Sequence, residues 1–169
     1  MPRRSKEVGA RISRPFASLT VAENLRIPLL YTAHTRSGRH LTQDESEARC
    51  HELATLVGLA PKANKLPRDL TQVEMRKLEL ARAMAADPKL LIADEAMAGL
   101  SHAEVDEIIA LLISLNEQGV TVIMIEHIMR AVMEFSQRLA VLVAGRKIAD
   151  GPPQDVVRDP EVVRAYLGE

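Results

Sequence analysis

The chain has 169 residues, of which 47% are hydrophobic and 2% aromatic, and its 22 basic and 23 acidic side chains give a formal net charge of −1. This length allows one domain that buries about two thirds of its unfolded surface, and the core is expected to be aliphatic. The balanced charge argues against a dedicated nucleic-acid binder. One cysteine, Cys50, excludes an intrachain disulfide. No apolar run approaches the roughly 18 residues of a membrane span, so we expect a cytosolic chain that reaches a membrane through a partner.

The first half of the sequence predicts helices after a polar, mobile lead-in over residues 1–13. Thr20 and Glu23 have the spacing of a capping box, which marks the start of a helix. A second amphipathic pattern stops at Gly58, a residue type that often ends helices. We expect helices over residues 20–30, 44–57 and 75–86, the last capped by Asp69 or Thr71, with a loop at 35–42 and a connector at 58–67.

From residue 87 onwards the pattern alternates between strands and helices. Ser101 with Glu104 three residues later predicts the start of one of these helices. We expect strands at residues 89–94, 119–125 and 139–143, helices at 101–117 and 128–136, a turn at 145–147, and two short helices at 155–157 and 160–167. The alternation over residues 96–150 is typical of a parallel α/β sheet.

Two adjacent carboxylates, Asp94 and Glu95, end the first of these strands. The apolar run before them predicts a strand that is buried on both faces. Ligands of open parallel sheets bind at the carboxyl ends of the strands. There Asp94 could hold Mg²⁺ while Glu95 polarises a water molecule. The same pair could equally be a solvated strand end, and the two residues alone favour that simpler interpretation.

Two other segments also place polar groups at the ends of elements. The strand at 119–125 is followed by Glu126 and His127, and residues 70–74 open the helix that leads to the acidic strand. This order resembles the ATP-hydrolysing subunit of ABC transporters: signature helix, Walker B strand, D-loop and switch histidine. From about residue 8 to the end, the chain is similar to the ATP-binding subunits of branched-chain amino acid importers. The segments that carry this similarity are residues 14–24, 78–83, 98–100, 125–127, 149–156 and 165–168.

The resemblance implies roles for the groups at the strand ends. Asp94 would bind Mg²⁺, and Glu95 would be the general base, a role typically worth 10²–10⁴-fold in rate. His127 would bind the γ-phosphate of ATP, whereas a histidine at a strand end without this context is more often a surface or capping residue. Ala96 stands where the family usually has proline. The D-loop would comprise Ala98, Gly99, Leu100 and Ser101, a segment that by itself also fits a simple helix-entry turn.

The signature position, where Leu-Ser-Gly-Gly-Gln is usual, holds Leu70, Thr71, Gln72, Val73 and Glu74. Its implied task is to present a hydroxyl and backbone N–H groups to the γ-phosphate of ATP held by the opposite subunit. Thr71 keeps the hydroxyl. Val73 replaces a glycine that allows the backbone to approach phosphate closely. The resemblance therefore predicts the helix, while Val73 argues against its contact with ATP.

One family motif has no counterpart in the sequence. The pattern Gly-x-x-x-x-Gly-Lys-Ser/Thr is absent from these residues, so they provide no Walker A loop to cradle the phosphates. Arg11 stands where ungapped counting places the Q-loop glutamine. We therefore expect the C-terminal part of an ABC ATPase subunit, catalytically incomplete in isolation. In the family's strand order the Walker A strand lies between those ending at His127 and Val143. We therefore expect the chain to close the gap by re-pairing these two strands, to borrow a strand from a partner, or to be poorly soluble when expressed alone.

The predicted fold class is α/β, a partial parallel sheet of the P-loop NTPase type with a helical subdomain. The expected parts are residues 20–86 (helical subdomain), 87–150 (Walker B, D-loop and switch histidine) and 151–169 (terminal helices). The resemblance implies an ATP-binding and ATP-hydrolysing subunit of an importer for branched-chain amino acids, peripheral on the cytoplasmic face of the inner membrane. Its cofactors would be ATP and Mg²⁺, and its partners transmembrane permease subunits, a second ATP-binding subunit and, indirectly, a periplasmic solute-binding protein, with no nucleic acid. The alternative is a non-catalytic remnant or regulatory partner of a complete ABC ATPase subunit, so whether the chain is an enzyme stays open.

Overall fold

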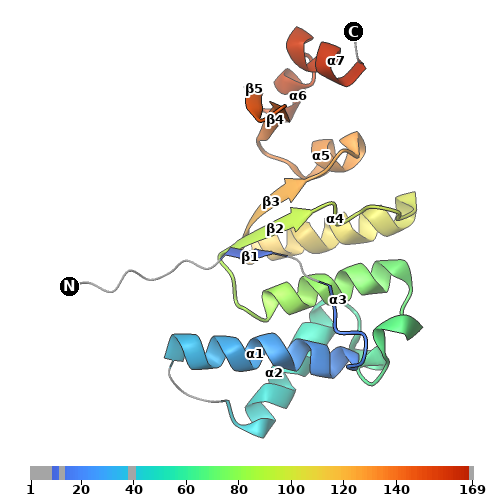
Figure 1. Cartoon of the computed structure of the whole chain (residues 1–169), viewed down its shortest axis with the longest axis vertical. Helices are drawn as coiled ribbons and strands as arrows, with labels where there is room; N and C mark the ends of the chain where they lie inside the picture. Colours follow the sequence, from blue (N-terminus) through green and yellow to red (C-terminus); the bar gives the residue numbers. More distant parts are fainter. Residues whose placement is uncertain (1–8, 12–13, 38–40, 168–169) are drawn as a thin grey trace, which may run out of the picture. The chain divides into compact units, whose positions relative to one another are not determined.

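The computed structural model describes residues 9–11, 14–37 and 41–167, which fall into two compact units divided between Ile125 and Glu126. The first unit contains β1 (Gly9–Arg11), α1 (Val21–Ser37), α2 (Gln43–Leu56), α3 (Gln72–Met84), β2 (Leu90–Asp94), α4 (His102–Glu117), β3 (Thr121–Ile125) and the short 3-10 helices η1 (Ala60–Lys62) and η2 (Pro67–Asp69) (Figure 1). The second contains α5 (Met129–Phe135), β4 (Leu139–Val143), β5 (Arg146–Gly151), α6 (Pro153–Val156) and α7 (Pro160–Leu167). No helix in the described ranges is long and apolar enough to cross a membrane.

The first unit is built on a parallel sheet with strand order β1-β2-β3. β2 is its central strand, and its register pairs Leu90 with Thr121 at one end and Asp94 with Ile125 at the other. The predicted parallel α/β arrangement is therefore confirmed for this unit. Two details differ from the expectation. β1 lies within the segment predicted to be a mobile lead-in, and β2 fully buries only alternate residues, since Leu91 and Ala93 are inaccessible while Leu90 and Ile92 are half-buried.

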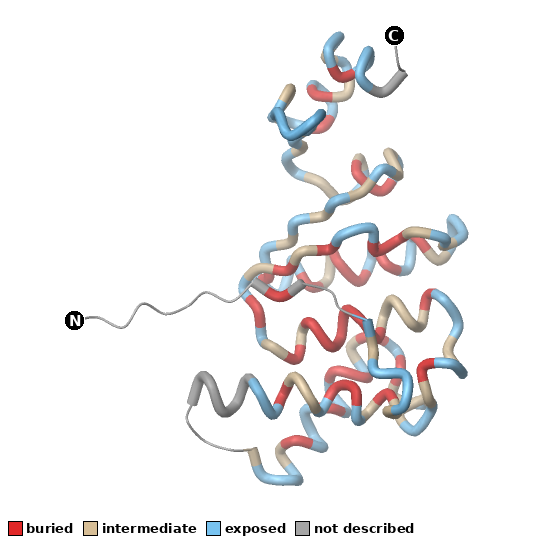
Figure 2. Tube along the Cα trace, in the orientation of Figure 1, coloured by how far each residue is buried: buried red, intermediate tan, exposed pale blue. Residues whose placement is uncertain are grey.

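The helices of the first unit begin where local sequence directs them. Thr42, Thr71 and Ser101 are the N-caps of α2, α3 and α4, and each forms a reciprocal capping box with a glutamate three residues later. Figure 2 marks the buried residues of these helices in red. As predicted from composition, they are mainly aliphatic, and the largest fully buried side chains include Leu25, Leu59, Leu78, Leu80, Ile108, Ile109, Leu112 and Leu115.

Two helix boundaries differ from the predictions. α1 continues through Pro28 to Ser37, so the start of the predicted loop at 35–42 is helical, while residues 38–40 lie outside the described part. α3 begins at Gln72, three residues earlier than expected. Thr71, one of the two predicted caps, is its N-cap, so the helix starts at the next residue.

The second unit contains a β-hairpin in place of a further parallel strand. β4 and β5 pair antiparallel through a tight turn at Ala144 and Gly145, both with positive φ, the backbone geometry of common two-residue hairpins. Arg138 and Lys147 both contact the Asp150 carboxylate, at 2.7 and 2.6 Å, and hold its pKa well below the ordinary value. The prediction that 139–143 joins the parallel sheet is wrong, because its described partner is β5.

The free edge of β3 bears on the expected gap in the sheet. Among the described residues, β2 is the only strand paired with β3. Ile123 and Ile125 are 47% and 51% exposed, although a run such as Thr-Val-Ile-Met-Ile is typical of strands buried on both faces. The two strands that flank the expected gap, β3 and β4, belong to different units, so how the gap is closed stays a prediction.

Candidate functional site

The carboxyl end of β2 carries the first predicted site. Asp94 is the last residue of β2 and lies opposite Ile125 of β3. The N–H of Glu95 donates to the Ile125 carbonyl at 3.0 Å, and the N–H of Ala98 donates to the Glu95 carbonyl at 3.2 Å. Asp94 and Glu95 are exposed, whereas Ala96 is buried beneath them. The fold thus holds two adjacent carboxylates in solvent at the end of a parallel strand, the position that the sequence predicted.

Glu95 has an uncommon backbone conformation. Its φ is +49°, in the left-handed region, which among the described non-glycine residues it shares with Asp87 and Ala144. Such a conformation costs on the order of 1–3 kcal/mol and persists where surrounding contacts impose it. Here the two backbone hydrogen bonds of the turn impose it. Because strained residues cluster at functional sites, this geometry supports a role for Glu95 beyond ending the strand.

The donor chemistry of this pair fits Mg²⁺. Carboxylate oxygens are hard ligands, and Mg²⁺ in nucleotide sites is usually held by one or two carboxylates together with substrate phosphates and water. The described residues contain no group of three or more His, Cys, Asp or Glu side chains able to hold a metal by themselves. The Asp94 and Glu95 pair is therefore suited to a Mg²⁺ ion that is also held by phosphates, and not to a metal site built from protein ligands alone.

His127 belongs to the second unit, while Asp94 and Glu95 belong to the first. Its side chain is exposed, and it lies between the end of β3 and the start of α5. The structure therefore confirms its place after the strand. Its joint action with the carboxylates stays a prediction.

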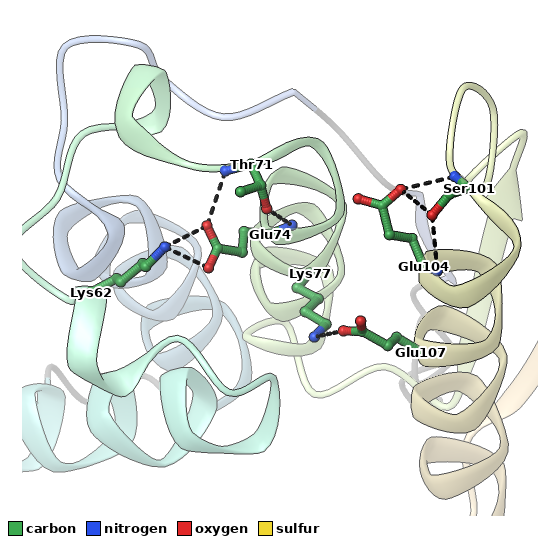
Figure 3. A network of polar contacts seen from close by, with 7 residues as sticks. All are labelled: Lys62, Thr71, Glu74, Lys77, Ser101, Glu104 and Glu107. Atoms are coloured by element: carbon green, nitrogen blue, oxygen red, sulfur yellow. Dashed lines mark hydrogen bonds and ion pairs between the residues drawn. The ribbon is translucent and has the colours of Figure 1, made fainter.

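The N-terminus of α3 carries the second predicted site, drawn in Figure 3. The Glu74 N–H donates to Thr71 Oγ1 at 3.4 Å, and the Thr71 N–H donates to Glu74 Oε2 at 2.9 Å. Lys62 Nζ lies 2.7 Å from Glu74 Oε2 and 2.6 Å from Glu74 Oε1. The hydrogen bond from Lys62, followed by that from the Thr71 N–H, lowers the pKa of Glu74. An ionised carboxylate therefore lies at the end of α3 that the family uses to bind phosphate.

The two residues before Glu74 also face partners within the chain. Val73 is buried, with 8% exposure. Gln72 Nε2 donates to the Ala98 carbonyl at 3.3 Å, and it lies so close to Gly99 that a Cβ at that glycine would be 2.5 Å from it. The predicted signature and D-loop segments are thus joined directly. With a carboxylate at its start and Val73 in its core-facing turn, this segment does not fit the γ-phosphate contact.

The predicted D-loop forms the entry turn of α4. Gly99 has a φ of +79°, which a glycine adopts without strain. The Ser101 N–H donates to Glu104 Oε2 at 2.8 Å, and the Glu104 N–H donates to Ser101 Oγ at 3.4 Å. Leu70 and Leu100, the apolar members of the two segments, are half-buried. The helix-entry geometry is confirmed, and a role at a dimer interface stays a prediction.

Sequence reasoning missed three contacts at this site. Lys62 is twelve residues from Glu74, and no sequence pattern indicates that they meet. The hydrogen bond from Gln72 to Ala98 joins residues that are 26 positions apart. The only sequence feature that hints at a close approach there is Gly99. A third link, Lys77 to Glu107 at 2.6 Å, connects α3 with α4 (Figure 3).

Comparison with known proteins shows similarity to ATP-binding subunits of transporters. The sequence model described as "ABC transporter" matches residues 2–98, and that described as "Branched-chain amino acid ATP-binding cassette transporter" matches residues 146–169. The high-affinity branched-chain amino acid transport ATP-binding protein BraF of Pseudomonas aeruginosa is 36% identical over 166 residues, with 92% of this chain and 65% of BraF covered. LivG of Escherichia coli, a protein of the same description, is 35% identical over 169 residues, again with 92% and 65% covered. The methionine import ATP-binding protein MetN of Bifidobacterium longum is 36% identical over 147 residues, with 86% of this chain and 35% of MetN covered.

Solved structures agree on the fold. A nucleotide-free ATP-binding cassette from an ABC transporter superposes with a TM-score of 0.82 at 24% identity, covering 95% of this chain and 68% of that one. CbiO1 from Clostridium perfringens, part of the transporter complex CbiONQ, superposes with a TM-score of 0.77 at 24% identity, covering 95% and 63%. The chain spans about two thirds of the length of BraF and LivG and about one third of MetN. Since a family model matches more than half of its residues, the chain belongs to the ABC transporter family.

Proposed function

We propose that this chain supplies the Walker B, D-loop and switch-histidine part of an ATP-binding subunit that energises an ABC importer. One observation carries the proposal: the Asp94 and Glu95 carboxylates stand exposed at the carboxyl end of β2, in a turn held by the Ile125 carbonyl. Asp94 would hold Mg²⁺, which neutralises charge on the phosphates. Glu95 would accept a proton from the attacking water, and His127 would orient that water.

The proposed solute class is branched-chain amino acids. BraF and LivG carry that description, and the match over residues 146–169 is to a segment described in the same terms. The proposed setting is the cytoplasmic face of the inner membrane, with permease subunits, a second ATP-binding subunit and a periplasmic solute-binding protein as partners. In the printed sequence no phosphate-loop motif occurs, so the proposal requires that another polypeptide segment supplies it.

The surface of α1 and of the segment that leads into it supports the proposed contact with a permease subunit. Phe16, Leu30 and Tyr31 are large apolar or aromatic side chains with 48%, 43% and 74% exposure. The entry to α1 is firmly held, since Asn24 accepts a hydrogen bond from the Phe16 N–H and donates to the Phe16 carbonyl. Cysteines placed at Arg26 and Tyr31 should cross-link to a co-expressed permease subunit, whereas capture only from residues 145–169 would contradict this docking.

Mixing with a phosphate-loop polypeptide tests the proposed activity. The partner would be a strand-loop-helix segment that carries Gly-x-x-x-x-Gly-Lys-Ser/Thr. The chain alone should neither bind ATP tightly nor hydrolyse it, because the missing loop normally supplies most contacts to the triphosphate. MgATP binding by calorimetry, with slow turnover, should appear on mixing. Glu95→Gln should keep the binding and lower turnover by about 10²–10⁴-fold.

Two outcomes would contradict the proposal. One is the absence of ATP binding in the mixture when both polypeptides are folded. The other is turnover, in the mixture or by the chain alone, that Glu95→Gln leaves unchanged.

The α3 terminus favours a second candidate function. Val73 stands where the family usually has a glycine that lets phosphate approach, and Glu74, which stands where glutamine is usual, is paired with Lys62. This favours a non-catalytic regulatory partner of a complete ATP-binding subunit. Stable association with such a subunit and no ATP binding in the mixing experiment would distinguish this alternative.

A further inference from the structure

We infer that the signature segment of this chain, residues 71–74, is closed to phosphate: Glu74 serves as an internal anion at the start of α3, and Gln72 and Val73 are committed to contacts within the chain. The inference deepens the proposed function and rests on it in one respect, that α3 is the helix expected to face a nucleotide held by another subunit. The residues present at the start of α3 do not suit the ATP contact that the resemblance implies.

The first step is charge. The start of a helix attracts anions because its N–H groups point outward and the helix dipole is positive there. In α3 that attraction is already used, since the Glu74 carboxylate accepts the Thr71 N–H at 2.9 Å. Thr71 Oγ1 in turn accepts the Glu74 N–H. A phosphate approaching the same turn would meet a like charge at close range.

The second step is restraint of that charge. Lys62, from η1, contacts both carboxylate oxygens of Glu74, at 2.6 and 2.7 Å. The cap of α4 provides a matched comparison, because Ser101 and Glu104 form the same reciprocal box. Among the described residues, Glu104 has Ser101 as its hydrogen-bond partner and no lysine. Glu74 is therefore fixed by a second element and cannot swing aside without breaking an ion pair.

The third step is steric. Close approach of phosphate to backbone N–H groups is easiest at glycine, and this segment has none. Val73 is buried against the core of the first unit. Gln72 extends over Gly99 and donates to the Ala98 carbonyl. All three side chains after Thr71 thus have structural roles, and the half-site that α3 would form with another subunit does not close on a triphosphate.

A phosphate titration tests the inference on the 169-residue chain itself. The probe is inorganic phosphate, and the readout is the set of backbone amide shifts of ¹⁵N-labelled protein, above all those of Gln72 and Val73. In the wild type these amides should show no saturable shift. Glu74→Gln removes the charge but keeps an oxygen acceptor for the Thr71 N–H, so the cap remains, and phosphate should bind there at least about tenfold more tightly.

Glu104→Gln is the matched control, because it removes the same charge from the same type of cap at α4. It should leave the Gln72 and Val73 amides unresponsive. A saturable shift of these amides in the wild type would overturn the inference, as would a folded Glu74→Gln protein that binds phosphate no better than the wild type. Neither readout depends on ATP turnover, so failure of this inference is distinguishable from failure of the proposed function.

Discussion

The carboxyl end of β2 and the start of α3 are both predicted to face a nucleotide, but their side chains are used differently. At β2, Asp94 and Glu95 are exposed, and backbone hydrogen bonds hold the turn that follows. At α3, Gln72, Val73 and Glu74 all contact other parts of the chain. A functional group that is exposed on a backbone-held turn remains accessible to a ligand. One that is itself part of the packing does not, even when its helix is intact.

The largest effect, on turnover, should come from a substitution at the exposed carboxyl end of β2. Asp94→Asn should lower Mg²⁺-dependent turnover in the mixture with the phosphate-loop polypeptide by at least about 100-fold, because the metal supplies several kcal/mol of charge stabilisation. Glu117→Gln, which removes a carboxylate at the last residue of α4, is the control and should change nothing. Equal turnover of Asp94→Asn and the wild type at limiting Mg²⁺ would remove the metal role from Asp94.

A smaller effect, on the free energy of unfolding, is expected at the contact between Gln72 and Gly99, which joins the two regions. Gly99→Ala places a Cβ 2.5 Å from Gln72 Nε2 at a φ of +79°, so it should lower the free energy of unfolding by about 1–3 kcal/mol. In a Gln72→Ala background the clash is gone and only the backbone strain remains. Denaturant unfolding of both single variants and the double variant should therefore give a positive coupling energy of at least about 0.5 kcal/mol. Strict additivity would show that the Gln72 bridge does not exist in solution.

The smallest effect is the pH dependence of the α3 cap. Lys62 and Thr71 lower the pKa of Glu74 in the folded state below its ordinary value of 4.5. A depressed carboxyl pKa stabilises the fold at pH values above the unfolded value, and this contribution is lost as the pH falls through the folded pKa. The stability difference between wild type and Glu74→Gln should therefore be present at neutral pH and shrink below pH 4.5. A difference that stays constant into acid would contradict an ionised Glu74.

Local patterns in the sequence predicted much of the fold. The boxes at Thr20 and Ser101 marked the starts of α1 and α4 because capping depends on residues three positions apart. The apolar runs predicted β2 and β3, and the acidic pair was correctly placed at a strand end. These features depend on short-range periodicity and hydrogen bonding, which a single sequence contains.

Long-range contacts were not predictable in the same way. β4 was expected in the parallel sheet, but an apolar strand carries no information on whether its partner is parallel or antiparallel. The first turn residue, Ala144, has a positive φ without being a glycine, so the sequence did not mark the hairpin at that position. The pairing of Lys62 with Glu74 depends on how η1 packs beside α3. For that reason Val73 was the only residue that argued against phosphate contact at the sequence level. The structure adds a stronger obstacle to phosphate, the charge of Glu74.

The most direct measurement compares Glu74→Gln with Glu95→Gln in the mixture with the phosphate-loop polypeptide, where two copies of the chain can face one another. If the start of α3 is closed by its own carboxylate, Glu74→Gln should raise ATP turnover by at least about tenfold. Adding Glu95→Gln to that variant should remove the gain, since the general base contributes about 10²–10⁴-fold. We predict opposite effects on ATP turnover, an increase for Glu74→Gln and a decrease for Glu95→Gln. A loss of turnover in Glu74→Gln comparable to that in Glu95→Gln would show that the native carboxylate at α3 serves the reaction, and it would contradict the contrast drawn between the two regions.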